Sequence, residues 1–309
     1  MIDNPWLNPM INPALNNLLD YPTPAIGLWR ITDWKYSTSE LVTWTEQVLD
    51  MGTRVFDLAD IYGNYEADAC FGKALAASPA LREKIILVTK CGMHLVSSNN
   101  PGIGIKHYDS SRKQIMASCE KSLRNLNTDR IDLLLIHRPD LLMDADEVAQ
   151  AFVDLKQSGK VLHFGVSNFT TSQFELLASR LPFPLITNQV EFSVLHTQPM
   201  FDGVFDQCQR LRITPMAWSP LGGGRLFKAT DEQAVRVRAA LEETSKQLGD
   251  LTIDQVAMAW IATHPSRVVT ITGSGKLDNI RRAIAACRLK LDRQQWYSIL
   301  RASQGHEVP

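Results

Sequence analysis

Eight short runs rich in Val, Ile and Leu recur along the chain, and a longer segment with helical periodicity follows each of them. The runs are expected to form strands at 25–29, 54–59, 84–90, 131–137, 163–168, 185–190, 213–219 and 267–273. They do not alternate cleanly between apolar and polar residues, which is typical of parallel strands buried on both faces. The matching helices are expected at about 38–50, 66–77, 110–126, 146–158, 170–180, 200–211, 252–263 and 276–287.

This order of strands and helices favours a (β/α)8 barrel, the TIM-barrel fold, and a doubly wound sheet is the alternative. Ser39 and Asp146 are the expected N-caps of two helices, and Gly52 and Gly159 stand where helices should end. No linker, internal repeat or low-complexity segment divides the chain, so residues 1–309 are expected to form a single domain. Two additional helices are expected outside the repeating pattern, at about 232–248 and 292–302.

Charge and cysteine content narrow the expected partner and compartment. A formal net charge of -1 gives no basic surface for nucleic acid or an anionic membrane, so a small molecule is the expected partner. No apolar stretch approaches the ~18 residues of a membrane span, and the N-terminal segment 1–17 lacks the apolar core of a secretory signal. Scattered cysteines without C-x-x-C pairs indicate reduced thiols in the cytoplasm. His163 and His196 lack metal-ligand spacing, so no metal is expected, and the chain is expected to be a monomer or weak homo-oligomer.

Polar and aromatic side chains stand where the expected strands end. In a (β/α)8 barrel these ends meet at one face, where active sites lie. Each of these residues has a structural explanation when it is considered alone. Asp57 would cap a helix, Lys90 would lie at the surface, and His137 would be a core histidine with its hydrogen bonds satisfied. On three successive strands, with Tyr62 on the loop after the second, they favour one shared site. The strand ends carry Trp29, Asp57, Lys90, His137, Ser167 with Asn168, Gln189, Trp218 with Ser219, and Gly273 with Ser274.

Four of these residues suit proton transfer to a carbonyl oxygen. A tyrosine hydroxyl has a reference pKa of ~10, and a nearby ammonium lowers it, so Lys90 is expected to make Tyr62 a usable general acid. Asp57 would keep the buried lysine charged, and His137 would hydrogen-bond the substrate oxygen and orient it. No side chain supplies hydride, so the sequence predicts a bound nicotinamide or flavin.

Seven segments carry a family resemblance: FDLADIYGNYE, LVTKCG, LLLIHRPD, GVSNF, NQVEFS, MAWSPLGGGRL and ITGSGK. In this order and spacing they resemble the aldo-keto reductase superfamily over residues 20–303, in its bacterial branch of broad-specificity or uncharacterised oxidoreductases. The resemblance implies a (β/α)8 barrel and NAD(P)H-dependent reduction of aldehydes or ketones. The family's catalytic tetrad would fall on Asp57, Tyr62, Lys90 and His137, with Tyr62 as the general acid.

The same resemblance places the cofactor along the mouth of the barrel. Ser167, Asn168 and Gln189 would hydrogen-bond the nicotinamide carboxamide, and Trp218 would stack on the ring. The glycine-rich loop would let backbone amides approach the pyrophosphate, and the helix at 276–287 would hold the 2'-phosphate at its start. The other residues expected to contact the cofactor are Trp29, Asp57, Ser219, Leu221, Gly222, Gly223, Arg225, Gly273, Ser274, Lys276, Arg281 and Arg282.

Two positions in the expected 2'-phosphate site depart from the best-studied members of the family. Gly273 stands where they carry a lysine, and Asn279 stands where they carry an arginine. Lys276, Arg281 or Arg282 would replace the missing charges. Such a cluster favours NADPH, and the departure leaves NADH as a possible second cofactor.

Two other functions compete with the reductase. A cofactor-binding sensor or accessory subunit on the same fold would bind nicotinamide tightly and turn over slowly. A metal-dependent barrel hydrolase would need clustered His and Asp ligands at the strand ends, where His137 is the single histidine. Arg138 has two interpretations: it meets a carboxylate-bearing substrate, or it pairs with Asp140.

Overall fold

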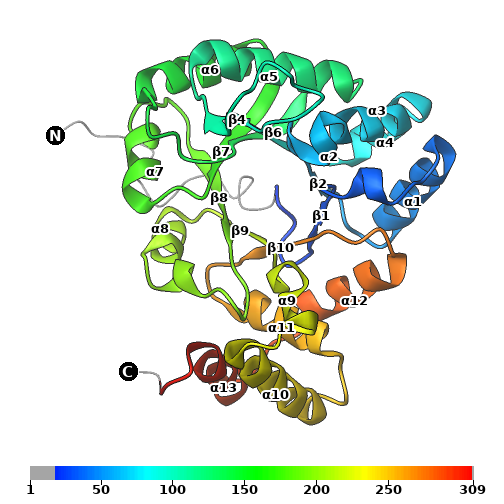
Figure 1. The fold of residues 1–309 in the computed structure, drawn as a ribbon, viewed down its shortest axis with the longest axis vertical. Helices are drawn as coiled ribbons and strands as arrows, with labels where there is room; N and C mark the ends of the chain where they lie inside the picture. The colour runs from blue at the N-terminus through cyan, green and yellow to red at the C-terminus, as the bar shows by residue number, and fades with distance from the viewer. Residues whose placement is uncertain (1–17, 308–309) are drawn as a thin grey trace.

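The computed structural model describes residues 18–307, so segment 1–17, expected to lack a secretory signal, lies outside the described residues. Eight parallel strands close into a barrel in the order β1-β10-β9-β8-β7-β6-β3-β2 (Figure 1). They are β1 (Ala25–Gly27), β2 (Val55–Asp57), β3 (Ile86–Cys91), β6 (Ile131–Ile136), β7 (Val161–Ser167), β8 (Leu185–Glu191), β9 (Met216–Trp218) and β10 (Val269–Thr272). A short antiparallel pair, β4 (Met93–His94) and β5 (His107–Tyr108), follows β3.

Closure of the barrel depends on β1, which pairs on both sides. Ala25 lies opposite Ile271 of β10, and Ile26 lies opposite both Thr272 and Phe56 of β2. Every barrel strand therefore has two neighbours. The predicted barrel is confirmed, and the doubly wound sheet, which would leave two open edges, is wrong.

Helices cover the outside of the barrel (Figure 1). The ring consists of α1 (Thr38–Asp50), α3 (Ala67–Ala77), α5 (Arg112–Asn125), α6 (Ala145–Gln157), α7 (Thr171–Ala178), α8 (Val204–Leu211), α11 (Ile253–Thr263) and α12 (Leu277–Cys287). The two expected additional helices, α10 (Glu232–Gln247) and α13 (Arg293–Gln304), pack together outside this ring (Figure 1). Three short helices were not expected: α2 (Tyr62–Tyr65), α4 (Ala80–Lys84) and α9 (Arg225–Lys228).

Both faces of the barrel strands are apolar, which explains their lack of alternation. In β6, Leu133 and Leu135 pack inside the barrel, whereas Leu134 and Ile136 pack outward against the helices. Each fully buried aliphatic side chain of this kind contributes about 1.5–3 kcal/mol relative to an exposed one. The interior is filled by Leu19, Ala25, Val55, Ile86, Val88, Leu133, Leu135, Ile186, Met216, Val269 and Ile271.

The capping residues of two helices differ from the expectation by two residues. Ser37, not Ser39, caps α1, because its side chain accepts from Glu40 N while the Glu40 side chain accepts from Ser37 N. This capping box needs a spacing of three residues, which Ser37 and Glu40 provide. Asp144, not Asp146, caps α6 by accepting from the amides of residues 146 and 147. The expected stops are confirmed, since the glycines at 52 and 159 follow these helices with φ of 89° and 71°.

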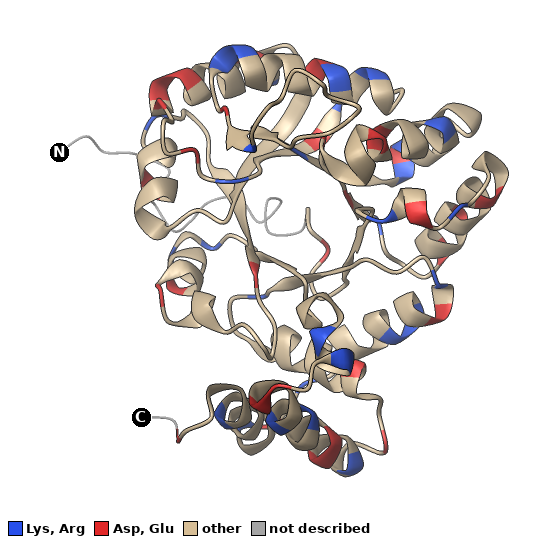
Figure 2. Cartoon of the chain, in the orientation of Figure 1, with Lys and Arg blue, Asp and Glu red and all other residues tan. Residues whose placement is uncertain are grey.

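Charged residues lie mainly on the outer helices, where acidic and basic side chains are interspersed (Figure 2). This mixture agrees with the formal net charge of -1. Within residues 18–307, no helix has both the length and the apolar character needed to cross a bilayer.

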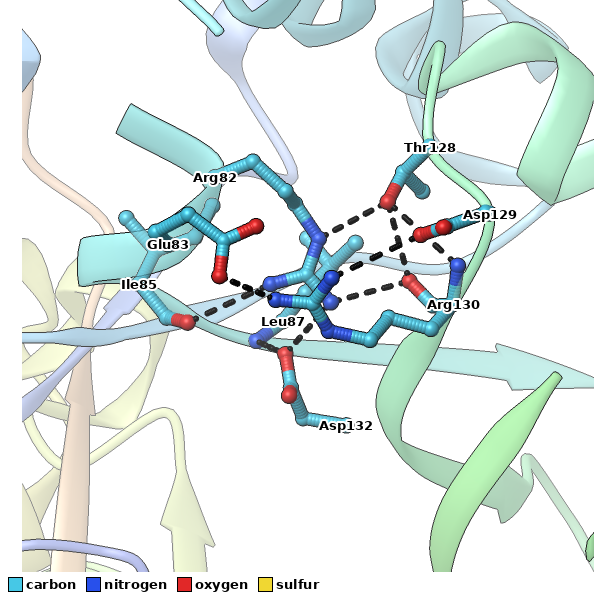
Figure 3. A network of polar contacts seen from close by, with 8 residues as sticks. All are labelled: Arg82, Glu83, Ile85, Leu87, Thr128, Asp129, Arg130 and Asp132. Carbon is cyan, nitrogen blue, oxygen red and sulfur yellow. Dashed lines mark hydrogen bonds and ion pairs between the residues drawn. The ribbon is translucent and has the colours of Figure 1, made fainter. Parts of the chain in front are cut away.

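A buried ion pair joins α4 to two barrel strands (Figure 3). Arg82 lies 2.8 Å from Asp132 Oδ2, and that same oxygen accepts from Leu87 N at 2.8 Å. Arg82 also donates to Thr128 Oγ1 at 2.8 Å and to the carbonyl oxygen of Arg130 at 2.9 Å. The guanidinium thus connects the loop before β6 with β3 and α4, at the barrel end opposite the carboxyl ends of the strands.

Removing the guanidinium should destabilise the fold, because Asp132 would be left as a buried carboxylate without its cation. Arg82→Met is expected to lower the free energy of unfolding by about 3–5 kcal/mol, measured by urea denaturation. Arg130→Met is the control, since it removes a surface ion pair with Glu83 and should cost about 0–1 kcal/mol. Equal losses in the two variants would contradict a special role for the buried pair.

Candidate active site

Asp57 and Lys90 meet at the carboxyl ends of β2 and β3, inside the barrel mouth. Lys90 Nζ donates to Asp57 Oδ2 at 2.7 Å and to the carbonyl oxygen of Leu58 at 2.7 Å. Both charged side chains are buried. Asp57 Oδ1 accepts a further hydrogen bond from Gln189 Nε2 at 2.9 Å. The ion pair is therefore held on both sides by hydrogen bonds, as a buried pair requires.

Tyr62 and His137 complete the expected group of four. Lys90 Nζ donates its third hydrogen bond to the Tyr62 hydroxyl at 3.1 Å. The Tyr62 ring stands edge-on to His137, with ring centres 5.7 Å apart and planes at 78°. Gly63, directly after Tyr62, has φ of 56°, and a Cβ there would lie 2.8 Å from Thr32 Cγ2. The structure thus brings together the four side chains that the sequence placed on separate elements.

Burial and charge act in opposite directions on Lys90 and Tyr62. Burial lowers the pKa of Lys90, but Asp57 and Tyr62 raise it more, so the net direction is upward and the ammonium is retained. Burial raises the pKa of Tyr62, and Lys90 opposes this rise without reversing it. The expectation that Lys90 lowers the tyrosine pKa below its ordinary value is not met, because burial outweighs the ammonium. Tyr62 is therefore a neutral phenol, able to donate a proton.

His137 is a neutral imidazole in this environment. Burial, followed by the charges of Lys90, Arg138 and Lys106, holds its pKa well below the usual range. Its Nδ1 is buried without a hydrogen-bond partner among residues 18–307. Among the same residues, no three His, Cys, Asp or Glu side chains are placed to hold a metal ion.

The residues expected to hold the nicotinamide form a hydrogen-bonded chain across β7, β8 and β9. Ser167 Oγ donates to the carbonyl oxygen of Gln189 at 2.8 Å and accepts from Asn168 Nδ2 at 2.7 Å. Trp218 Nε1 donates to Asn168 Oδ1 at 3.0 Å. Asn168 has a positive φ of 60°, a conformation that concentrates at functional sites. The amide and hydroxyl groups of this set match a carboxamide in donor and acceptor type.

The loop after β9 has the backbone expected of a phosphate site. Its three consecutive glycines at 222–224 have φ of 60°, 63° and 97°, so no side chain stands between their backbone and a ligand. Ser219 also has a positive φ, of 50°. Leu221 is half-buried against the α10–α11 core, and Arg225 pairs with Asp231 at 3.2 Å. Trp29, after β1, is 58% exposed with the Arg30 guanidinium 5.1 Å from its ring.

The segment from Gly273 to Lys276 leads into α12. Ser274 Oγ accepts from Lys276 N at 3.2 Å and from Asn279 Nδ2 at 3.0 Å. The two arginines expected to supply charge are engaged within the chain: Arg281 pairs with Asp278, and Arg282 contacts Asp254 and Asn279 Oδ1. Lys276 is exposed and forms no ion pair within residues 18–307, so it is the cation most available to a phosphate.

Two buried carboxyls behind the site were not among the expected residues. Ser118 Oγ donates to Asp60 Oδ2, and Ser122 Oγ donates to Asp68 Oδ2 at 2.7 Å. The other oxygen of each carboxyl is buried without a partner among the described residues. Burial raises the pKa of Asp60 to about 7 and that of Asp68 to about 6. The matching spacing of the two serines on one face of α5 is the sequence signal for this pair.

Comparison with known proteins gives consistent matches along the chain. A model described as the aldo/keto reductase family matches residues 25–303. The oxidoreductase YdhF of Escherichia coli is 51% identical over 284 residues, 92% of this chain and 94% of that protein. A 6-dehydroglucose reductase of Agrobacterium fabrum is 42% identical over 296 residues, 96% and 98% of the two chains. A solved thermostable aldo-keto reductase, in complex with the inhibitor epalrestat, matches with a TM-score of 0.75 at 27% identity, covering 90% and 94%.

The raised pKa of Asp60 makes stability depend on pH. Folding lifts this pKa from 3.8 to about 7, so its contribution is complete below about pH 4 and is lost as the pH rises through 7. Asp60→Asn retains an acceptor for Ser118 but cannot ionise. It should raise the free energy of unfolding by up to about 4 kcal/mol at pH 8, with little effect at pH 4.

Urea denaturation at several pH values measures this difference. Asp68 also faces Asp60 and favours its neutral form, whereas Lys121 and the backbone amide of Ile61 oppose this. Asp129→Asn, at an exposed position, is the control and should leave the pH dependence unchanged. An Asp60→Asn effect of the same size at pH 4 and pH 8 would contradict the raised pKa.

Proposed function

Because the chain belongs to the aldo/keto reductase family, and is thus an NAD(P)H-dependent oxidoreductase, we propose that it reduces aldehydes or ketones to alcohols with Tyr62 as the proton donor. The observation that supports this proposal is the hydrogen bonding of Lys90 to both Asp57 and Tyr62. Lys90 thus connects the Asp57 carboxylate to the Tyr62 hydroxyl. The Tyr62 ring also lies next to His137. The arrangement suits a group that gives up a proton and must then hold a negative charge.

The nicotinamide, when bound, supplies the hydride that reaches the carbonyl carbon. Tyr62 gives its proton to the carbonyl oxygen, and its own oxygen becomes a phenolate 3.1 Å from the Lys90 ammonium. Asp57 keeps Lys90 charged throughout, because a buried lysine without an anion would lose its proton. His137, being neutral, can donate one ring N–H to the carbonyl oxygen and hold it towards Tyr62.

The hydrogen-bonded chain of Ser167, Asn168 and Trp218, with Gln189, would hold the nicotinamide end of the cofactor. The glycine loop at 222–224 would receive the pyrophosphate. We propose NADPH as the preferred cofactor, with NADH as the weaker one, because Lys276 and Ser274 stand at the start of α12 where a 2'-phosphate would bind. The five cysteines are free thiols, which supports a cytoplasmic location.

One of the relatives is named as a reductase of 6-dehydroglucose, a sugar derivative. We therefore include sugar aldehydes with aromatic and aliphatic aldehydes, ketones and dicarbonyls in the panel that defines the substrate. Oxidation of NADPH and NADH, followed by absorbance, measures each reaction.

Tyr62→Phe removes the transferable proton and keeps the ring. The turnover number should fall by about 100-fold or more, since a positioned general acid contributes on the order of 100- to 10,000-fold. The NADPH dissociation constant should stay within about three-fold, as measured by quenching of tryptophan fluorescence. Tyr297→Phe, at an exposed position on α13, is the matched control. A Tyr62→Phe enzyme with wild-type turnover would remove the proton-donor role.

Lys276→Met tests the cofactor preference. Loss of a charge-assisted contact to the 2'-phosphate should weaken NADPH binding by about ten-fold, whereas NADH, which lacks that phosphate, should change by less than about two-fold. Fluorescence titration gives both dissociation constants. Lys246→Met on α10 is the control at an exposed lysine. Equal weakening of both cofactors would place Lys276 elsewhere on the binding surface.

A further inference from the structure

Arg138 follows His137 directly at the barrel mouth, and its side chain is half-buried. Its guanidinium carbon lies 5.2 Å from the centre of the Trp218 ring, so the cation rests over the indole face. A stacked arginine keeps its N–H donors at the edge of the guanidinium plane, where they remain available to an acceptor. Arg138 therefore presents a positioned cation beside the group proposed to orient the carbonyl oxygen.

The expected protein partner of Arg138 is engaged elsewhere. Asp140 Oδ2 accepts from Ser110 N at 2.9 Å and from Ser110 Oγ at 3.0 Å, and its Oδ1 accepts from Leu142 N at 2.9 Å. Within the described residues, Arg138 forms neither an ion pair nor a side-chain hydrogen bond; its contact is with Trp218. Of the two interpretations drawn from the sequence, pairing with Asp140 is therefore wrong.

Positive charge predominates around the proposed proton-transfer site. Lys90 is neutralised by Asp57 at 2.7 Å, but no carboxylate of the described chain is paired with Arg138 or with the exposed Lys106. The pKa of His137 reflects this surplus: burial lowers it first, and then Lys90, Arg138 and Lys106 lower it further, with no carboxylate raising it. The mouth thus offers uncompensated positive charge to a ligand.

We propose that Arg138 binds a carboxylate on the substrate, and that the enzyme prefers aldehydes or ketones carrying such a group. This inference rests on the proposed reductase function. The guanidinium fork matches a carboxylate with two parallel hydrogen bonds, and the half-buried position strengthens the pair relative to water. Lys106 adds a second cation that attracts the anion to the mouth. Arg138 is thus a specificity-determining residue, separate from the four that carry out proton transfer.

The test compares two aldehydes of the same shape, 4-carboxybenzaldehyde and its neutral carboxamide, 4-formylbenzamide. Wild type should favour the carboxylate in kcat/KM by about ten-fold or more, a difference typical of one charge-assisted pair. Arg138→Gln should raise KM for the carboxylate by about 10- to 100-fold and change kcat little. The same variant should change both constants for the amide by less than about three-fold. Arg138→Lys should retain part of the preference, because it keeps the charge and loses the fork.

Arg301→Gln, an exposed arginine on α13, is the control and should leave both aldehydes unaffected. Equal losses for the two aldehydes in Arg138→Gln, or a wild type without preference, would overturn the inference while leaving the reductase function intact. A parallel loss of NADPH affinity in Arg138→Gln would also overturn it, by assigning the residue to the cofactor.

Failure of the proposed function has a different signature, namely that wild type turns over neither these two aldehydes nor any other member of the carbonyl panel. Calorimetric binding of benzoate to the NADPH complex then tests Arg138 without catalysis. Benzoate should bind wild type about ten-fold more tightly than Arg138→Gln. Equal affinities for benzoate would overturn the inference.

Discussion

The buried ion pair between Lys90 and Asp57 is the interaction on which the site depends. Two charges removed from water are costly unless their remaining donors and acceptors are satisfied. Here Leu58 and Tyr62 accept from the ammonium, and Gln189 donates to the carboxylate. These contacts connect β2 and β3 with β8 on the far side of the barrel. The same ion pair therefore holds the strand ends together and places a charged lysine beside Tyr62. A phenol beside this ammonium remains neutral because of burial, yet has a cation ready to stabilise its anion.

The closed parallel barrel makes such a site possible from residues far apart in the sequence. The strand ends all face one mouth, so β2, β3 and β6 deliver Asp57, Lys90 and His137 without long loops. The next strands supply the polar chain that ends at Trp218. The opposite end of the barrel carries the ion pair of Arg82 with Asp132, which lies outside the site and holds elements together. The stabilising ion pair and the candidate active site thus lie at opposite ends of the barrel.

Periodic features of the sequence predicted the fold, and polar residues at strand ends predicted which side chains the fold brings together at the barrel mouth. The sequence did not predict the short helices. One of them, α4, is a single turn that is held in place by contacts of Arg82 with residues far along the chain. The rise in the Tyr62 pKa was not predicted either, because it depends on the balance between burial and nearby charge in the folded protein. Sequence spacing alone does not show that Arg281 and Arg282 have acidic partners. Pairing of charges is a property of the folded chain.

The basic side chains discussed above fall into two groups, those with an acidic partner in the chain and those without one. Arg82 and Lys90 are buried and fully engaged by groups of the chain, as the low dielectric of the interior demands. Lys276, just before α12, and Arg138, just after β6, are more exposed and have no carboxylate partner among the described residues. A half-buried arginine without an anionic partner adds little to the stability of the fold. Beside the proposed proton-transfer group, Arg138 is therefore better explained by an anionic ligand that completes the ion pair.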